Sequence, residues 1–239
     1  MQGSYANIKA LTFDVFGTVV DWYGSIVAEG ETFGNARGID IDWAEFALEW
    51  RAGYGPAMDR VRRGELPWLN IDALHRLILD ELLETFDIGG MGEADKDHLN
   101  RVWHRLNPWP DAVNGLKRLR TEYIIATLSN GNVALLTNMA KYAGLPWDCI
   151  LSAELTQHYK PDPEVYETAA ALLGLSPNAV MMVAAHPGDL RAAAAVGFQT
   201  AFVPRPLEYG PDVVRDVNAQ PSDLVANDFN ELADLLGVE

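Results

Sequence analysis

The spacing of hydrophobic positions changes twice along the chain. The first apolar run, Ile8–Phe13, is short and is followed by the turn Asp14-Val15-Phe16-Gly17-Thr18, which predicts a buried strand. From Tyr23 to Leu106 no strand pattern is present, and apolar residues such as Phe46 and Trp50 recur at helical spacing. We therefore expect a helical insert, residues 23–106, directly after the first strand.

The second half of the chain alternates between two patterns. Short apolar runs predict strands at Tyr123–Leu128, Cys149–Ser152, Ala179–Val183 and Thr200–Val203. Helical spacing predicts helices at Val113–Arg120, Val133–Tyr142, Pro163–Leu173 and Leu190–Val196. Strands that alternate with helices indicate an α/β fold with a doubly wound parallel sheet, here built from residues 1–22 and 107–239.

Two further segments are interpreted from their composition and spacing. The proline-containing stretch Asn107–Pro110 is predicted to be the linker by which the chain returns from the insert. The stretch Pro204–Glu239 is predicted to be a loop with a final helix at Phe229–Leu236, and it carries no functional signal.

Composition and charge narrow the environment and the partners. The chain has no apolar run of about 18 residues, which argues against a membrane span. Met1–Lys9 lacks the apolar stretch of a secretory signal and Cys149 is the single cysteine, so we expect a cytoplasmic protein. A net charge of −16 argues against nucleic acid and anionic membranes as partners. It leaves room for a small anionic substrate held by a few local cations.

Polar side chains follow four of the predicted strands. Because the carboxyl ends of parallel strands meet at one edge of a sheet, where ligands bind, we expect these side chains to converge. They are Asp14 and Thr18 after the first strand, Ser129 and Asn130 after the second, Lys160 after the third, and His186 and Asp189 after the fourth.

The order of these residues is also that of a known family. Asp14-Val15-Phe16-Gly17-Thr18, Leu128-Ser129-Asn130-Gly131, and Tyr159-Lys160-Pro161-Asp162 followed by Tyr166 resemble the motifs of the haloacid dehalogenase superfamily. Within this superfamily the chain is most similar to the L-2-haloacid dehalogenases. The pair Trp50-Arg51 resembles the site of the cap-domain arginine in those enzymes. The resemblance implies a Rossmann-type core with a helical cap domain at residues 23–106, and a homodimer.

Two positions argue against the magnesium-dependent phosphatases of the same superfamily. Those enzymes carry a second acid two residues after the nucleophile, where this chain has Phe16, and an aromatic ring cannot act as a general acid. They also place a metal-binding aspartate directly after the fourth strand, whereas here Ala184, Ala185 and His186 precede Asp189. Halide leaves as a weakly basic anion and needs neither proton donor nor metal, so we expect no cofactor.

The resemblance implies the roles of the main catalytic residues. Asp14 is expected to displace halide from a small 2-haloalkanoic acid and to form an ester, which water then hydrolyses to a 2-hydroxy acid. Lys160 keeps Asp14 ionised, Asp189 activates or positions the water, and Arg51 receives the halide. Fluoroacetate is a further candidate substrate, because additional hydrogen-bond donors would suit fluoride.

Supporting roles are expected for the remaining candidates. Thr18, Ser129 and backbone amides near Phe16 are expected to hold the substrate carboxylate and the nucleophile. Asn130 and Tyr166 are expected to support the site by hydrogen bonds.

Several of these residues have an ordinary alternative. Arg51 has Arg60, Arg62 and Arg63 nearby, and its alternative is a surface arginine of an amphipathic helix. Thr18 and Asp189 are also common near helix N-termini.

His186 marks a departure from the family. The better-known members carry Ser-x-Asn where this chain has Ala184 and His186. We hypothesise that His186 contacts the nucleophile, the hydrolytic water or the halide. The alternative is an ordinary loop histidine.

Three other functions stay open at this point. They are a magnesium-dependent small-molecule phosphatase, a non-catalytic member that binds carboxylates or acts as an interaction module, and a hydrolase that uses the same ester chemistry on another activated carboxylate.

Overall fold

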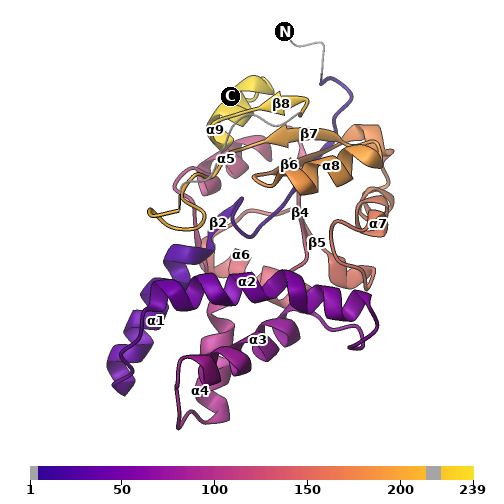
Figure 1. Cartoon of the computed structure of the whole chain (residues 1–239). Helices are drawn as coiled ribbons and strands as arrows, with labels where there is room; N and C mark the ends of the chain where they lie inside the picture. Colours follow the sequence, from indigo (N-terminus) through magenta and orange to yellow (C-terminus); the bar gives the residue numbers. More distant parts are fainter. Residues whose placement is uncertain (1–4, 214–221) are drawn as a thin grey trace.

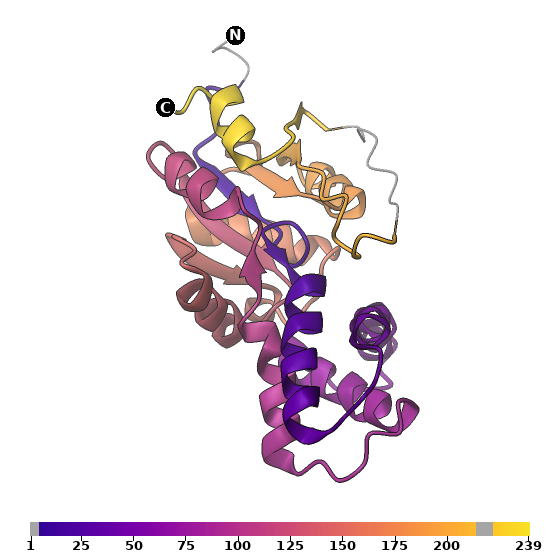
Figure 2. The same ribbon diagram turned by 90° about the vertical axis from the view of Figure 1, so that its left-hand side faces the viewer.

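The computed structural model describes residues 5–213 and 222–239, so parts of the predictions for Met1–Lys9 and Pro204–Glu239 lie outside the described residues. Figure 1 shows a sheet flanked by helices, with the helices of the insert gathered at one end. Figure 2 shows from the side that the C-terminal helix α9 (Phe229–Leu235) lies at the opposite end of the molecule.

The central sheet is parallel and has six strands within the described residues. Its spatial order is β5 (Cys149–Ser152), β4 (Ile124–Ser129), β1 (Ala10–Phe13), β6 (Val180–Ala184), β7 (Gln199–Phe202) and β8 (Leu224–Val225). The first strand of the sequence therefore lies in the interior, between β4 and β6. This order confirms the predicted α/β fold.

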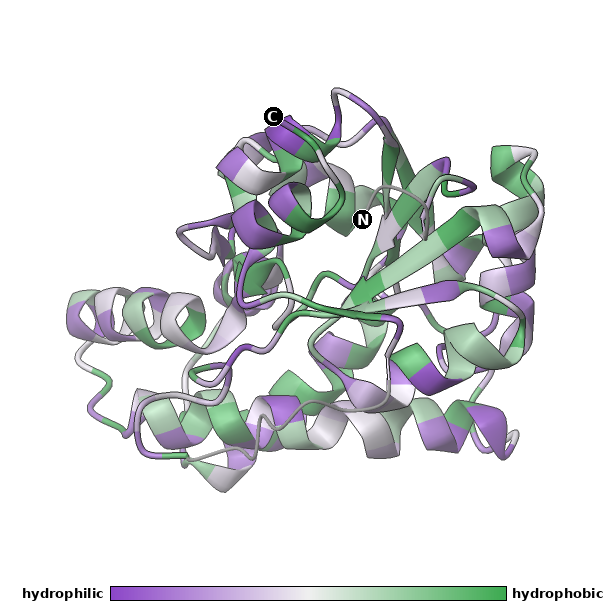
Figure 3. Ribbon diagram, turned by 90° about the horizontal axis from the view of Figure 1, so that it is seen from above, coloured by the Kyte–Doolittle hydropathy of each residue, from purple (hydrophilic) through white to green (hydrophobic). Residues whose placement is uncertain are grey.

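Helices cover both faces of the sheet because both faces of its strands are apolar. Along β6, Met181 and Val183 join the hydrophobic cluster on one face, and Val180 and Met182 join the cluster on the other. In Figure 3 much of the sheet is coloured hydrophobic, whereas the helices carry both kinds of position. One face packs on α5 (Ala112–Leu119), α6 (Val133–Ala143) and α9 (Phe229–Leu235), and the other packs on α7 (Pro163–Leu173) and α8 (Pro187–Ala195).

The insert is helical, as its spacing predicts. It contains α1 (Trp22–Arg37), α2 (Trp43–Arg62), α3 (Ile71–Thr85), α4 (Glu93–Asn100) and the 3-10 helix η1 (Arg101–His104). The first three helices start at side chains that accept hydrogen bonds from free backbone N–H groups: Asp21, Asp42 and Asn70. The apolar side chains of the insert form one continuous cluster with α5, α6 and α9. The insert therefore packs directly against the core.

Three features depart from the predictions. The predicted linker contains a strand, since β3 (Asn107–Pro108) pairs with β2 (Val20–Asp21) where the chain leaves and re-enters the core. The strand β8 lies in a stretch predicted to be loop. Strands of two residues carry no readable periodicity, which is why both were missed. Helix α8 begins at Pro187, so Asp189 lies in its first turn.

His75 is buried where the insert meets the core. It is 1% exposed, its ring stacks on Trp103 at a centroid distance of 4.0 Å, and neither ring nitrogen has a hydrogen-bond partner among the described residues. Burial lowers the pKa of His75 from 6.5 to about 3. The native state therefore holds this imidazole neutral.

This burial predicts an acid-dependent loss of stability that His75→Leu reduces. Below pH 6.5 the unfolded chain binds a proton at His75, whereas the native state binds it only below about pH 3. The free energy of unfolding therefore decreases as the pH is lowered from 6.5 to 3. Between pH 6.5 and pH 5 the effect amounts to about 2 kcal/mol. Urea unfolding at several pH values measures it. An equal acid slope in the parent and the variant would contradict this account.

Candidate active site

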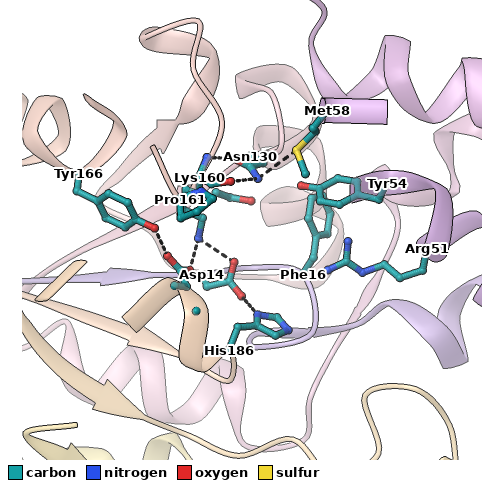
Figure 4. A pocket seen from close by; sticks show the side chains of 13 residues that line it. Asp14, Phe16, Arg51, Tyr54, Met58, Asn130, Lys160, Pro161, Tyr166 and His186 are labelled. Atoms are coloured by element: carbon teal, nitrogen blue, oxygen red, sulfur yellow. Dashed lines mark hydrogen bonds and ion pairs between the residues drawn. The ribbon is translucent and has the colours of Figure 1, made fainter. Parts of the chain in front are cut away.

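One pocket gathers the residues that follow the sheet strands. It encloses about 240 Å³, and α2 covers it from the side of the insert (Figure 4). Nine of the ten candidate site residues line it, together with Tyr54, Met58, Pro161 and Gly188. The tenth, Thr18, is fully buried and bonds to Asp14. The nine are Asp14, Phe16, Arg51, Ser129, Asn130, Lys160, Tyr166, His186 and Asp189.

Asp14 is 7% exposed, follows β1 directly, and accepts three hydrogen bonds from described residues. Lys160 Nζ donates to its Oδ1 at 3.0 Å. The Thr18 hydroxyl donates to its Oδ2 at 2.7 Å, and His186 Nδ1 lies 2.8 Å from the same oxygen. The carboxylate is thus fixed from two sides.

Lys160 bridges two carboxylates. Besides Asp14, its ammonium contacts Asp189 Oδ2, while the Tyr166 hydroxyl donates to Asp189 Oδ1 at 2.5 Å. Figure 4 shows the contact between the Lys160 ammonium and Asp14 as a dashed line. Asp14, Lys160 and Asp189 come from the carboxyl-end side of the sheet, as the sequence predicts, and Tyr166 reaches Asp189 from α7.

The surroundings of Asp14 and Asp189 shift the pKa values of the two carboxylates in opposite directions. Burial alone would raise the pKa of Asp14, but Lys160 and His186 outweigh it and hold that pKa below its usual range. The pKa of Asp189 is raised, because its burial and the nearby Asp14 charge outweigh the opposing influence of Lys160. Asp14 is therefore the carboxylate held ionised, and Asp189 is the stronger base of the two.

The backbone of Lys160 is held from both the core and the insert. Asn130 Oδ1 accepts a hydrogen bond from the Lys160 N–H at 2.6 Å. Arg62 of α2 donates to the carbonyl oxygens of Tyr159 and Lys160 at 3.1 and 3.0 Å. Ser129, which also lines the pocket, accepts from the Gly131 N–H at 3.1 Å. Hence Asn130 and Arg62 fix the position of the lysine.

Arg51 differs from the other arginines of α2 and its end. Arg60, Arg62 and Arg63 pair with carboxylates outside the pocket-lining set. Arg51 lines the pocket, and its guanidinium lies over the rings of Tyr54 and Trp22 at 4.5 and 5.8 Å. Its Nε is buried without a hydrogen-bond partner among the described residues. The structure therefore places Arg51, and not its neighbours, where an anion can bind.

The apolar part of the pocket comes from both halves of the molecule. Phe16 follows β1 and packs against Tyr54 and Trp103 at centroid distances of 6.5 and 5.6 Å. Met58 lies beside Tyr54 on α2. These side chains give a short carbon chain an apolar surface between the cations.

One contact comes from Pro204–Glu239, a stretch whose sequence tells nothing about function. Glu208, from the loop after β7, is fully buried, and its Oε1 lies 2.9 Å from His186 Nε2. The sequence of Pro204–Glu239 gives no functional signal, and the structure places its residue Glu208 against His186. No local pattern marks Glu208, since its partners are distant in sequence. Tyr54 and Met58 had a readable signal, because they share a helix face with Arg51 at spacings of three and seven.

The fold and this arrangement define a class of hydrolase. The chain belongs to the haloacid dehalogenase-like hydrolases, whose family model matches residues 8–197.

Its relatives narrow the comparison. The chain is 32% identical to an (S)-2-haloacid dehalogenase of Burkholderia cepacia, over 85% of this chain and 87% of that protein. It is similar to the crystal structure of the L-2-haloacid dehalogenase PA0810, with 46% identity and a TM-score of 0.93 over 96% of this chain and 99% of that one. A defluorinating L-2-haloacid dehalogenase, Rha0230, matches with 43% identity and a TM-score of 0.94, over 97% and 96%.

Two features are absent from the described residues. None of their helices is long and apolar enough to cross a membrane. Across residues 5–213 and 222–239, no three or more His, Cys, Asp or Glu side chains are grouped so as to hold a metal ion.

Lys160→Met is expected to lower the free energy of unfolding by about 3–5 kcal/mol at neutral pH, because it removes the ammonium that the two buried carboxylates of Asp14 and Asp189 share. Burial would then raise the folded-state pKa of these groups, so the loss should shrink as the pH falls and they take up protons. Denaturant unfolding at pH 7 and pH 5 measures both effects. Lys96→Met, which breaks the partly exposed pair with Asp80, is the control and should cost about 1 kcal/mol or less. Equal losses in the two variants would contradict the expectation.

Proposed function

We propose that this protein hydrolyses small 2-haloalkanoic acids to 2-hydroxy acids through an ester on Asp14, without a metal. The observation that carries the proposal is a buried, doubly supported carboxylate that faces Arg51 across a small pocket. A nucleophile and an anion-binding cation on opposite sides of the substrate suit a displacement from the face opposite the halide.

The site residues would act in two steps. Asp14 attacks the halogen-bearing carbon, and the departing halide moves toward Arg51. Water then attacks the Asp14 ester, with Asp189 as the base that accepts its proton, consistent with the raised pKa of Asp189. Lys160 holds both carboxylates, while Ser129, Thr18 and the backbone near Phe16 position the nucleophile and the substrate carboxylate.

Two features disfavour a phosphatase reaction. Phe16 stands where a general acid would be needed, and its ring packs among Tyr54, His75 and Trp103. Both oxygens of Asp189 already accept hydrogen bonds, from Lys160 and Tyr166, so this carboxylate has fewer free lone pairs for a metal ion.

The relatives refine the proposal. Those compared above are named (S)-2- or L-2-haloacid dehalogenases, and we extend this preference to the present chain. We also propose that residues 23–106 serve as the cap domain of residues 1–22 and 107–239. A cytoplasmic homodimer is proposed from the family resemblance, and sedimentation at assay concentration would test the dimer.

The function is tested by halide release from chloroacetate and from each enantiomer of 2-chloropropionate, with EDTA present. The parent should release chloride, with a preference for the (S) enantiomer, and Asp14→Asn should lose at least about a thousandfold in rate because it lacks the nucleophile. Arg60→Ala, on the same helix but outside the pocket, is the matched control and should retain the parent rate. Chloride release by Asp14→Asn at the parent rate would refute the mechanism. Magnesium-dependent hydrolysis of a phosphate ester in its place would favour the phosphatase.

Fluoroacetate is expected to be a slower substrate. Arg51 supplies nitrogen donors to the pocket, which suits a small and strongly accepting halide, and one similar structure is named as defluorinating. A fluoride electrode measures the product directly. Consumption of chloroacetate with no fluoride release from fluoroacetate would rule this extension out.

A further inference from the structure

A third carboxylate lies behind His186, on the side away from Asp14. Glu208 Oε1 lies 2.9 Å from His186 Nε2 and 3.3 Å from the indole nitrogen of Trp22, which can only donate. The backbone of the nucleophile loop passes against it at Gly17, where φ is +82° and a Cβ would lie 2.2 Å from Oε1. The loop can approach Glu208 this closely only because residue 17 is glycine.

Both ring nitrogens of His186 face carboxylate oxygens. Nδ1 lies 2.8 Å from Asp14 Oδ2, and Nε2 lies 2.9 Å from Glu208 Oε1. Ionised carboxylates only accept hydrogen bonds, so this geometry suits an imidazolium with a proton on each nitrogen. Burial opposes that charge, but Asp14 and Glu208 raise the pKa of His186 to about 9. Lys160, Asp189 and Arg51 are the other charged groups of the same pocket.

The two oxygens of Asp14 are not equivalent. The Thr18 hydroxyl accepts a hydrogen bond from the Ala185 N–H at 2.9 Å and so directs its own proton to Oδ2. With Thr18 and His186, Oδ2 has both lone pairs engaged. Among the described residues only Lys160 donates to Oδ1, so that oxygen keeps a lone pair free. Oδ1 is therefore the atom suited to attack, and Oδ2 becomes the carbonyl oxygen of the ester.

We propose that Glu208 is a positioning residue that holds His186 as an imidazolium, and that His186 Nδ1–H and the Thr18 hydroxyl form the oxyanion hole for hydrolysis of the Asp14 ester. The inference rests on the proposed function, since it requires that an ester form at Asp14. It assigns to His186 a task in the second step of the reaction.

Hydrolysis of the Asp14 ester conserves atoms and charge. Water bonds to the carbonyl carbon and gives one proton to Asp189, while the carbonyl electron pair moves onto Oδ2. The negative charge on Oδ2 then lies against two donors that are already in place. When the pair returns, the bond from the carbonyl carbon to Oδ1 breaks. Oδ1 leaves in the 2-hydroxy acid with the proton from Asp189, and the remaining water proton is released from Asp14 to solvent.

Glu208→Gln tests the proposal by separating the two steps. Chloride release from chloroacetate reports ester formation, and glycolate release reports its hydrolysis, both in single-turnover quenched-flow experiments. Loss of one oxyanion donor typically costs about 100- to 1,000-fold, and this variant weakens the donor without removing it, so we expect hydrolysis to slow by about tenfold. Ester formation should slow less, and mass spectrometry of the quenched protein should therefore detect accumulated ester on Asp14.

Glu29→Gln is the matched control, because it removes a carboxylate charge that pairs with Arg105 in the insert, outside the pocket-lining set. It should change neither step. Hydrolysis by Glu208→Gln at the parent rate would overturn the inference and leave the proposed function standing. If the parent releases no chloride and forms no ester on Asp14, the proposed function and the inference fail together.

Histidine NMR provides a readout that a merely structural role would not move. The His186 signal, identified by its loss in His186→Gln, should titrate at about pH 9 in the parent and at a lower pH in Glu208→Gln. The same midpoint in both proteins would overturn the proposal. Should Glu208→Gln fail to fold, His186→Gln takes its place in the quenched-flow experiment: it should accumulate ester, and hydrolysis at the parent rate would refute the oxyanion hole.

Discussion

The ammonium of Lys160, buried between Asp14 and Asp189, is the contact on which the rest of the site depends. Two carboxylates and a lysine whose side chains are each at most 10% exposed would be unfavourable to bury singly, and they are stable there only as a paired set. The set exists because its three residues meet at one edge of a parallel sheet. They lie directly after β1, in the segment after β5, and in the first turn of α8. The order of the strands thus brings the opposite charges together, which offsets the cost of burying them.

The same lysine couples the insert to the chemistry. Arg62 of α2 donates to the Lys160 carbonyl oxygen, while Asn130 at the end of β4 accepts from its N–H. A second connection lies at Asn132, whose side chain accepts from the Asp72 N–H of α3 and donates to the Asp72 carboxylate at 2.9 Å. The segment after β4 is therefore fixed to the insert at the point where it borders the pocket. A shift of the insert would disturb both the position of Lys160 and the placement of Arg51.

The sequence predicted those parts of the structure that depend on the spacing of hydrophobic residues and on the order of strands and helices along the chain. The strand and helix patterns gave the sheet, and the residues after each strand gave Asp14, Lys160 and Asp189, because parallel strands must end together. Arg51 was ambiguous, since Arg62 lies eleven residues on, three turns later on the same helix face. Only the contacts seen in the structure distinguish Arg51, which lines the pocket, from Arg62, which pairs with Asp59. Glu208 was out of reach, because it meets Trp22 and His186 through contacts that no local pattern encodes.

The arrangement of charges also explains why Asp14 can lose its charge during the proposed reaction. Lys160 has two carboxylate partners, Asp14 and Asp189, and His186 likewise has two, Asp14 and Glu208. Esterification neutralises the shared member. Lys160 then keeps Asp189, and His186 keeps Glu208, so neither cation is left in a dry pocket without a counter-charge. Arg51, which has no carboxylate partner among the described residues, remains the cation available to the halide. In the proposed arrangement His186 adds a cation beside the nucleophile, and the buried Glu208 is the group that compensates its charge.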